Sequence, residues 1–375
     1  GTTMNMIFAT ESDIAWHFLG HMPIRKKGWG ALPQPSVDPD TGWEEGFIPV
    51  EELPHVQGPE NGALATANND PNGLAGFPVL SGDWFDSYRQ ERALEALTTR
   101  DDWTVEGMAA LQLDTVSIPW QQLRTRVLEF ACSTRASRQA QSLLRRWDGR
   151  VEADSVGASV FQLFLAAMIR RIVQAKAPNS AEWALGRGFM ALAPNSSLSM
   201  RRVAHAVDLI LEQPEGWFSS GWLDAIDRAL ASAVNTLRAT HGKRPKRWLW
   251  GHVRPVTFVH PVGEVPVLSA AFNIGPLHLG GDTNTLQCAS VDPADPLANP
   301  VGIATMRMTV EVGNWEHNRW ALAGGQSGNP LSPHYDDMVP LWMKAEGAPI
   351  AWTPEEVRAG AVATLELCPV DVPAK

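Results

Sequence analysis

Apolar residues dominate two short segments between residues 4 and 19, on either side of a polar stretch from Glu11 to Asp13. Two apolar runs joined by such a turn predict a β-hairpin. Prolines and glycines become frequent over residues 23–71, with aromatic residues spaced among them. This composition favours an ordered irregular segment that aromatic side chains hold in place.

The hydrophobic pattern becomes helical over residues 83–238. Apolar residues there recur at i, i+3 and i+4, which places them on one face of a helix. The segments with this period are 88–97, 105–113, 120–132, 136–146, 156–174, 200–211 and 222–237. β-Branched or alternating runs return at 253–259, 265–272 and 303–312, which predicts strands.

The order of strands, helices and strands predicts an α+β fold in three sections. Residues 1–82 would supply strands and loops of the core, residues 83–245 a helical section, and residues 246–375 strands and loops that return to the core. We expect a sheet whose outer strands come from both ends of the chain.

A formal net charge of −10 argues against binding to nucleic acid or to an anionic membrane, since both need a basic face. The only basic run contains Lys243, Arg244, Lys246 and Arg247. Because no other basic residues are concentrated nearby in the sequence, we interpret it as a solvated connection.

Cys132, Cys288 and Cys368 lie far apart without CxxC spacing, so they support neither a zinc site nor a redox motif. The uncharged apolar run over 156–169 is 14 residues long, which is too short for a membrane span and suits a buried helix. The first residues have no charged or apolar signal region, so we expect any signal peptide to have been removed or to lie upstream.

Several short motifs, in one order, resemble the penicillin acylase family of N-terminal-nucleophile hydrolases. The motifs are GFIPVEELP at 46–54, ATANN at 65–69, DW at 83–84, YRQER at 88–92, LLRRWDG at 143–149, WGH at 250–252, FVHP at 258–261, GGDTNT at 280–285 and GGQSGNPLSPHYDD at 324–337. The resemblance covers nearly the whole chain.

The resemblance implies a four-layer αββα fold, of which this chain is a part with a helical middle section. Such enzymes cleave themselves to free a serine at the start of a β subunit, and its own α-amine acts as the base. Residue 1 here is glycine, which has no side-chain nucleophile. We therefore expect the chain to match the later part of the β subunit and to be inactive alone.

Asn68, in Ala67-Asn68-Asn69, matches the asparagine whose amide stabilises the oxyanion in the family. A side-chain amide in a dry site is a suitable donor for that purpose. Local sequence alone would predict an ordinary turn, because Asp70, Pro71 and Gly73 follow. The resemblance favours the oxyanion role for Asn68 only.

The family also places an arginine near this asparagine, and Arg92 is the predicted match. Its fork of donors could fix the asparagine carbonyl or act on the amine of the nucleophile. Two alternatives stay open. Arg89 could be the match, or Arg92 could pair with Glu91 or Glu95 on a solvated helix face.

Family members often hold one structural Ca²⁺ between subunits, and the resemblance assigns two ligands here. Asp83 would supply a carboxylate and Pro23 a backbone carbonyl, both of which suit this cation. The remaining ligands would come from other segments. The alternative is that Asp83 is the N-cap of the helix that contains Tyr88.

Three other groups of residues have catalytic residue types but predict structural roles. His17 and His21 lie in a strand-like segment, where their spacing does not suit a metal. Ser332, His334 and the aspartates after it predict capping of a loop, because triads form through folding and not adjacency. Asp282 predicts a turn held by its carboxylate, since the lysine of a phosphate loop is absent.

The sequence therefore predicts part of an amidase that acts on linear N-acyl amides through an acyl-enzyme. Candidate substrates are β-lactams and N-acyl homoserine lactones. The expected partners are an α subunit and the nucleophile-bearing start of the β subunit, and the family implies a periplasmic or secreted location. The alternative is a non-catalytic binding or scaffold protein that retains the acylase framework.

Overall fold

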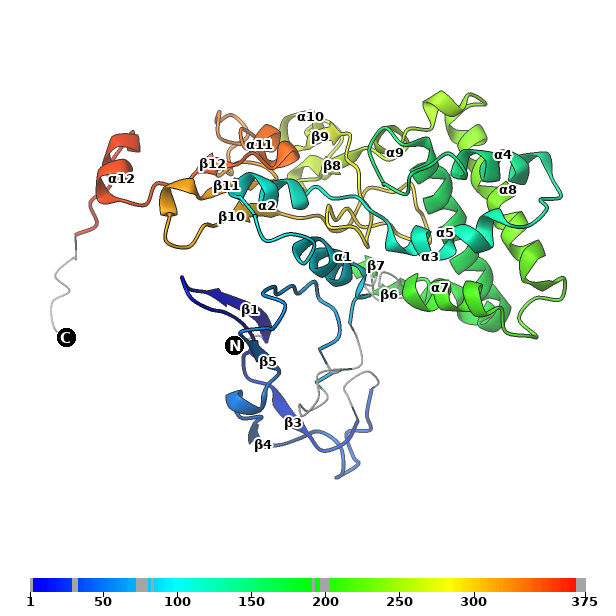
Figure 1. Ribbon diagram of the computed structural model, residues 1–375, viewed down its shortest axis with the longest axis horizontal. Coiled ribbons are helices and arrows are strands. Elements are labelled where there is room, and N and C mark those ends of the chain that lie inside the picture. The colour runs from blue at the N-terminus through cyan, green and yellow to red at the C-terminus, as the bar shows by residue number, and fades with distance from the viewer. Residues whose placement is uncertain are drawn as a thin grey trace.

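The computed structural model describes residues 3–28, 33–71, 80–81, 84–190, 193–195 and 203–368. The N-terminal strands lie apart from a large body of helices, and the C-terminal strands continue that body (Figure 1). The helix α1 (Tyr88–Leu97) lies between the N-terminal strands and the rest of the chain.

The predicted hairpin is confirmed. Strands β1 (Met4–Ala9) and β2 (Ile14–Leu19) pair antiparallel, and β5 (His55–Gln57) adds to the other side of β2. The Pro/Gly-rich segment also contains β3 (Pro23–Arg25), β4 (Trp43–Phe47) and the 3₁₀ turn η1 (Val50–Glu52). A small core stabilises this section, built from Trp16, Phe18, Met22, Leu53 and Leu80.

The helical section is confirmed by helices that follow the predicted segments. These are α1, α2 (Val105–Leu111), α3 (Ile118–Leu128), α4 (Arg135–Leu144), α5 (Val156–Lys176), α7 (Val203–Glu212) and α8 (Gly221–His241). Side-chain hydroxyls cap several helix N-termini, a position at which such polar residues are preferred. The Ser155 Oγ, for example, accepts the Ala158 N–H at 3.1 Å. Short elements follow α5: η2 (Pro178–Ser180), α6 (Ala181–Ala184), β6 (Arg187–Met190) and β7 (Ala193–Asn195).

The helix α5 is the centre of the main core. It packs against α4 and α8, and Phe161 and Phe164 on it contact a cluster with Trp120 and Trp147. The helix is apolar and long enough to span a bilayer by composition, but 72% of its most apolar window is buried inside the protein. Such burial is typical of a core helix.

The C-terminal section contains short strands and short helices. Its strands are β8 (Val256–Phe258), β9 (Ile274–Leu277), β10 (Met306–Thr309), β11 (Arg319–Leu322) and β12 (Ala348–Pro349). Its helical elements are η4 (Pro245–Arg247), α9 (Trp250–Val253), η5 (Pro261–Glu264), α10 (Ser269–Phe272), η6 (Trp315–His317), α11 (Val339–Lys344) and α12 (Pro354–Gly360).

The prediction of a strand over residues 265–272 was wrong. The chain turns there, because the Leu268 N–H donates to the Val265 carbonyl, and then forms α10. The Ser269 hydroxyl also donates to the carbonyl of Pro266. Pro266 has no N–H to donate to a neighbouring strand, and the Ser269 hydroxyl bonds locally. Both features favour a turn over the hydrogen-bond ladder of a sheet.

Strands form near both ends of the described chain, but they do not pair with each other to form one sheet. The sheet order is β1-β2-β5 near the N-terminus and β10-β11-β12 near the C-terminus, so the two groups do not pair. The hairpin tip nevertheless approaches the second group, since a Cβ on Gly313 would lie 3.2 Å from the Glu11 carboxylate. β1 and β10 remain edge strands.

Candidate functional site

The Asn68 turn has a backbone conformation that few residues adopt. Asn68 has φ 64°, in the left-handed region that asparagine tolerates better than most side chains. Its carbonyl accepts the Phe85 N–H at 2.9 Å, and the Asn69 side chain accepts the Ala67 N–H at 3.1 Å. These bonds fix the turn against the segment that precedes α1.

Arg89, in the first turn of α1, orients the Asn68 side chain. One guanidinium nitrogen donates to the Asn68 Oδ1 at 3.1 Å and to the Ala67 carbonyl at 2.7 Å. The guanidinium carbon lies 5.5 Å from the centroid of the Phe85 ring, a cation–π distance. Because Oδ1 faces Arg89, the Nδ2 amide group points the other way.

The Asn68 amide borders a cavity of about 790 Å³, which we call the Asn68 cavity. Its lining residues are Thr3, Met4, Asn5, Phe18, His21, Met22, Pro23, Arg25, Asn68, Leu80, Ser81, Trp84 and Phe85. Within the described ranges the Nδ2 of Asn68 has no partner. A side-chain amide has two N–H donors that can bind an oxygen.

The contact predicted for Arg92 is made by Arg89, the alternative match. Arg92 points elsewhere on α1, where its Nε and Nη2 donate to both carboxylate oxygens of Asp114 at 3.0 and 2.9 Å. Its Nη1 also pairs with Glu95 at 2.9 Å. Hydrogen bonding to Asp114 raises the pKa of Arg92 further above its ordinary value. This bidentate pair holds Arg92 in a structural role.

The two predicted calcium ligands have different outcomes. Pro23 lies in β3 opposite Phe47 and lines the Asn68 cavity. Asp83 lies outside the described residues. The capping alternative for Asp83 is wrong, because the residue before α1 is Ser87. No three metal-binding side chains gather within the residues that the structure describes.

Within the N-terminal section, His17 and His21 face different rings. His17 stacks on His55 at 5.1 Å between ring centroids. His21 lies against Phe47 at 4.7 Å and lines the Asn68 cavity. No sequence pattern predicts this position of His21, because it results from the pairing of β3 with β4.

The structural roles predicted for the C-terminal motifs are confirmed. The Ser332 hydroxyl accepts the backbone N–H of His334 at 3.2 Å, and the His334 ring pairs with Asp337 at 2.8 Å. The buried Asp282 carboxylate accepts the Asn284 N–H at 2.7 Å and the Gln162 amide. Burial raises the pKa of Asp282.

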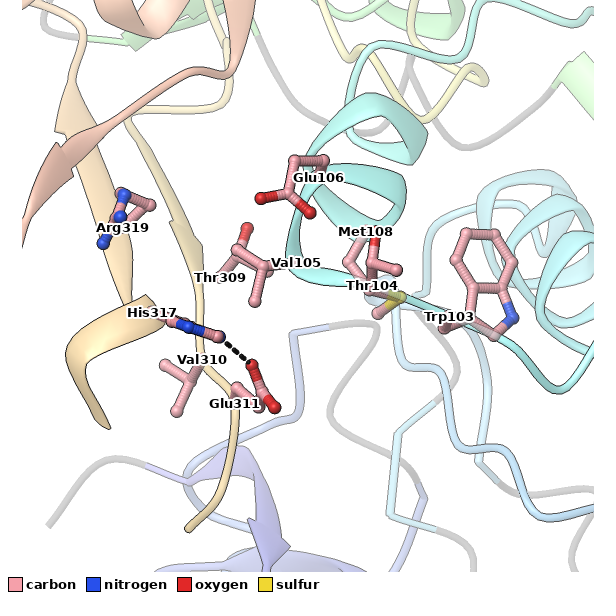
Figure 2. A pocket seen from close by; sticks show the side chains of 10 residues that line it. All are labelled: Trp103, Thr104, Val105, Glu106, Met108, Thr309, Val310, Glu311, His317 and Arg319. Carbon is pink, nitrogen blue, oxygen red and sulfur yellow. Dashed lines mark hydrogen bonds and ion pairs between the residues drawn. The ribbon is translucent and has the colours of Figure 1, made fainter. Parts of the chain in front are cut away.

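A second cavity, of about 550 Å³, lies between α2 and the strands β10 and β11 (Figure 2). The pair between His317 and Glu311 crosses one side of it at 2.7 Å, and Glu106 faces it from α2. Backbone hydrogen bonding lowers the pKa of Glu106. None of the predicted site residues lines this cavity, so it is not the candidate active site.

The fold is similar to that of a solved structure. The chain superposes on a thermostable penicillin G acylase from Alcaligenes faecalis with a TM-score of 0.61 at 18% identity, covering 99% of this chain and 68% of that one. This similarity confirms an α+β fold that is part of the N-terminal-nucleophile hydrolase architecture.

Sequence comparison supports the same conclusion. The family model of penicillin amidase matches residues 1–359. The chain is 31% identical over 361 residues to the penicillin acylase 2 proenzyme of a Pseudomonas species, and 28% identical over 378 residues to the acyl-homoserine lactone acylase QuiP of Pseudomonas fluorescens. Each match covers 94% of this chain but only 45% and 44% of the relative. The chain belongs to the penicillin amidase family, a family of acylases.

The two arginines of α1 should have separable effects in the complete acylase. Arg89→Gln should lower kcat for amide hydrolysis by roughly ten- to a hundred-fold, because the Asn68 amide loses its orientation. Arg92→Gln should leave kcat nearly unchanged and lower the free energy of unfolding by about 2–3 kcal/mol, because it leaves the buried Asp114 with poorer pairing.

Steady-state kinetics and urea unfolding of the two variants test this division. If Arg92→Gln lowered kcat as strongly as Arg89→Gln at equal stability, Arg89 would not be the arginine that serves Asn68.

Proposed function

We propose that this chain is the later part of the β subunit of an acylase that hydrolyses N-acyl amides. The carrying observation is the Asn68 side chain, whose carbonyl oxygen accepts a hydrogen bond from Arg89 and which belongs to the lining of the Asn68 cavity. A fixed donor at this place would stabilise the oxyanion that forms when an amide carbonyl is attacked.

The reaction would proceed in two steps on a serine supplied by another segment. The serine hydroxyl oxygen attacks the amide carbonyl carbon as its proton passes to a base, and the oxyanion accepts the Asn68 N–H. The C–N bond then breaks, and the amine leaves with the proton. Water attacks the acyl-serine ester through a second oxyanion, which releases the acid and restores the serine.

The Asn68 cavity supports an apolar acyl group. Phe18, Met22, Leu80, Trp84 and Phe85 contribute aromatic and aliphatic surface to it. Burying such surface against an apolar chain or ring contributes about 25 cal/mol per Å². This composition suits the acyl chains of β-lactams and of N-acyl homoserine lactones. The two relatives are named as acylases of penicillin and of acyl-homoserine lactone.

Exposed apolar strands support the proposal that further segments complete the enzyme. In β1, Met4, Ile7 and Phe8 are 52%, 46% and 46% exposed, although they point to both faces of the strand. In β10, Met306 and Met308 are both 48% exposed. Asn68 is also exposed, whereas an oxyanion donor acts most strongly where water is excluded. The chain spans less than half the length of its two named relatives.

Substitution of the two asparagines tests the proposed function. In the complete acylase, Asn68→Ala should lower kcat by roughly 10²- to 10³-fold with little change in folding, the usual effect of removing one oxyanion donor. Asn69→Ala is the matched control. It removes the acceptor for the Ala67 N–H and should mainly lower stability, by about 1 kcal/mol.

The readouts are kcat for a chromogenic phenylacetyl amide and the midpoint of thermal unfolding. Equal losses of kcat in the two variants would show that Asn68 is an ordinary turn residue. A loss of kcat in Asn68→Ala that is explained by lower stability would show the same.

We also propose a structural Ca²⁺ near the Asn68 cavity and a periplasmic or secreted location. Of the two predicted ligands only Pro23 lies among the described residues, so Asp83 and other segments would supply further oxygens toward the six to eight that Ca²⁺ needs. Cell fractionation tests the location, and recovery in the cytoplasm alone would contradict it.

Metal analysis tests the calcium proposal. The complete acylase, dialysed against calcium-containing buffer, should retain about one Ca²⁺ per molecule, and a chelator should lower its unfolding temperature. Asp83→Asn should lose most of this response. Absence of bound calcium, or an unchanged unfolding temperature with chelator, would contradict the proposed calcium site.

A further inference from the structure

Three cationic side chains from separate segments line one cavity on the helical section. Arg135 begins α4, Arg238 lies in the last turn of α8, and Lys243 follows that helix. Together with Gln139 they border a cavity of about 690 Å³. Helices α4 and α8 lie at the far end of the molecule from the N-terminal strands (Figure 1).

None of these three cations forms an ion pair with a carboxylate in the described part of the chain. Arg228 on the same helix α8, in contrast, pairs with Asp224 at 2.7 Å. Among these described residues, one side-chain hydrogen bond forms: Arg238 donates to the Gln139 carbonyl oxygen. Gln139 is neutral, so this bond does not balance the charge of Arg238. Three neighbouring positive charges without a counter-charge repel one another, which an anion would relieve.

The position of Arg135 also opposes the stability of its own helix. It is the first residue of α4, and the first turn contains no acidic residue. A helix N-terminus carries partial positive charge, so a cation there is unfavourable by a few tenths of a kcal/mol or more. Negative charge in the cavity would interact favourably with both the helix end and the arginine.

The basic run identified in the sequence continues from this cavity. Lys243 and Arg244 lead into η4, and the Trp248 indole anchors the run by donating to the Gly242 carbonyl at 2.8 Å. The interpretation of this run as a solvated connection depended on the absence of other basic residues nearby. Arg135 and Arg238 border the same cavity as Lys243, so that reason no longer holds.

We propose that this cavity is a binding site for a phosphate-bearing anion. Guanidinium groups offer paired donors that match phosphate oxygens, and lysine adds a mobile point charge. The cavity, of about 690 Å³, is much larger than one phosphate group. The site is independent of the Asn68 cavity, and it is compatible with the net charge of −10 because the positive charge is local.

Calorimetric titration with inorganic pyrophosphate tests the site on the full chain in the form in which it purifies. We expect a dissociation constant below about 1 mM in low salt that weakens as salt rises. The variant Arg135→Gln/Lys243→Gln changes two exposed side chains and should weaken binding at least about ten-fold. Arg238 is left in place because it is half-buried.

The matched control is Arg228→Gln/Arg358→Gln, which removes the same charge from exposed, ion-paired positions. It should bind pyrophosphate within about two-fold of the parent, since both residues lie outside the cavity lining. Circular dichroism of each variant checks that the fold is retained.

Sedimentation with vesicles distinguishes the two sources of phosphate. Binding to vesicles that contain phosphatidic acid, lost in the first variant and absent with pure phosphatidylcholine, would assign a lipid headgroup. Pyrophosphate binding without vesicle binding would assign a soluble phosphate compound. No binding of either probe, or equal weakening in both double variants, would overturn the proposal.

Discussion

The orientation of one amide group depends on how α1 is held. Arg89 fixes the Asn68 Oδ1 from one side of this helix, while Arg92 binds Asp114 from another. The Tyr88 hydroxyl adds a 3.2 Å bond to Gln122 on α3. A rigid support of this kind is what an oxyanion donor needs, because it must not reorganise during the reaction. Helix α1 thus sets the orientation of the Asn68 amide, which lies in a loop 21 residues before Arg89 in the sequence.

The sequence predicted what local patterns control. Helical periodicity located the central helices, the polar stretch at Glu11 located the hairpin, and the ATANN motif located Asn68. It could not choose between Arg89 and Arg92, because both lie on α1 and the choice depends on Asp114, which is 22 residues beyond Arg92. It also could not predict that Arg135 and Lys243 line one cavity, since this depends on the packing of α4 against α8.

Two features of the chain fit the proposal that further segments complete it. Its helical section has a large apolar core, whereas its edge strands expose methionine and phenylalanine side chains and Asn68 lines an open cavity. Exposed apolar strands promote pairing with further strands. Covering them would both stabilise the chain and exclude water from Asn68, so assembly and catalysis would depend on the same contacts.

Reconstitution tests the central claim most directly. The pure chain is assayed for phenylacetyl amide hydrolysis alone and after co-expression with an acylase segment that begins with serine. The account predicts no turnover alone, and turnover sensitive to serine reagents in the complex, which serine-to-alanine substitution in the added segment abolishes. Serine-reagent-sensitive turnover by the chain alone would contradict it, as would a stable lone chain that the added segment neither binds nor activates.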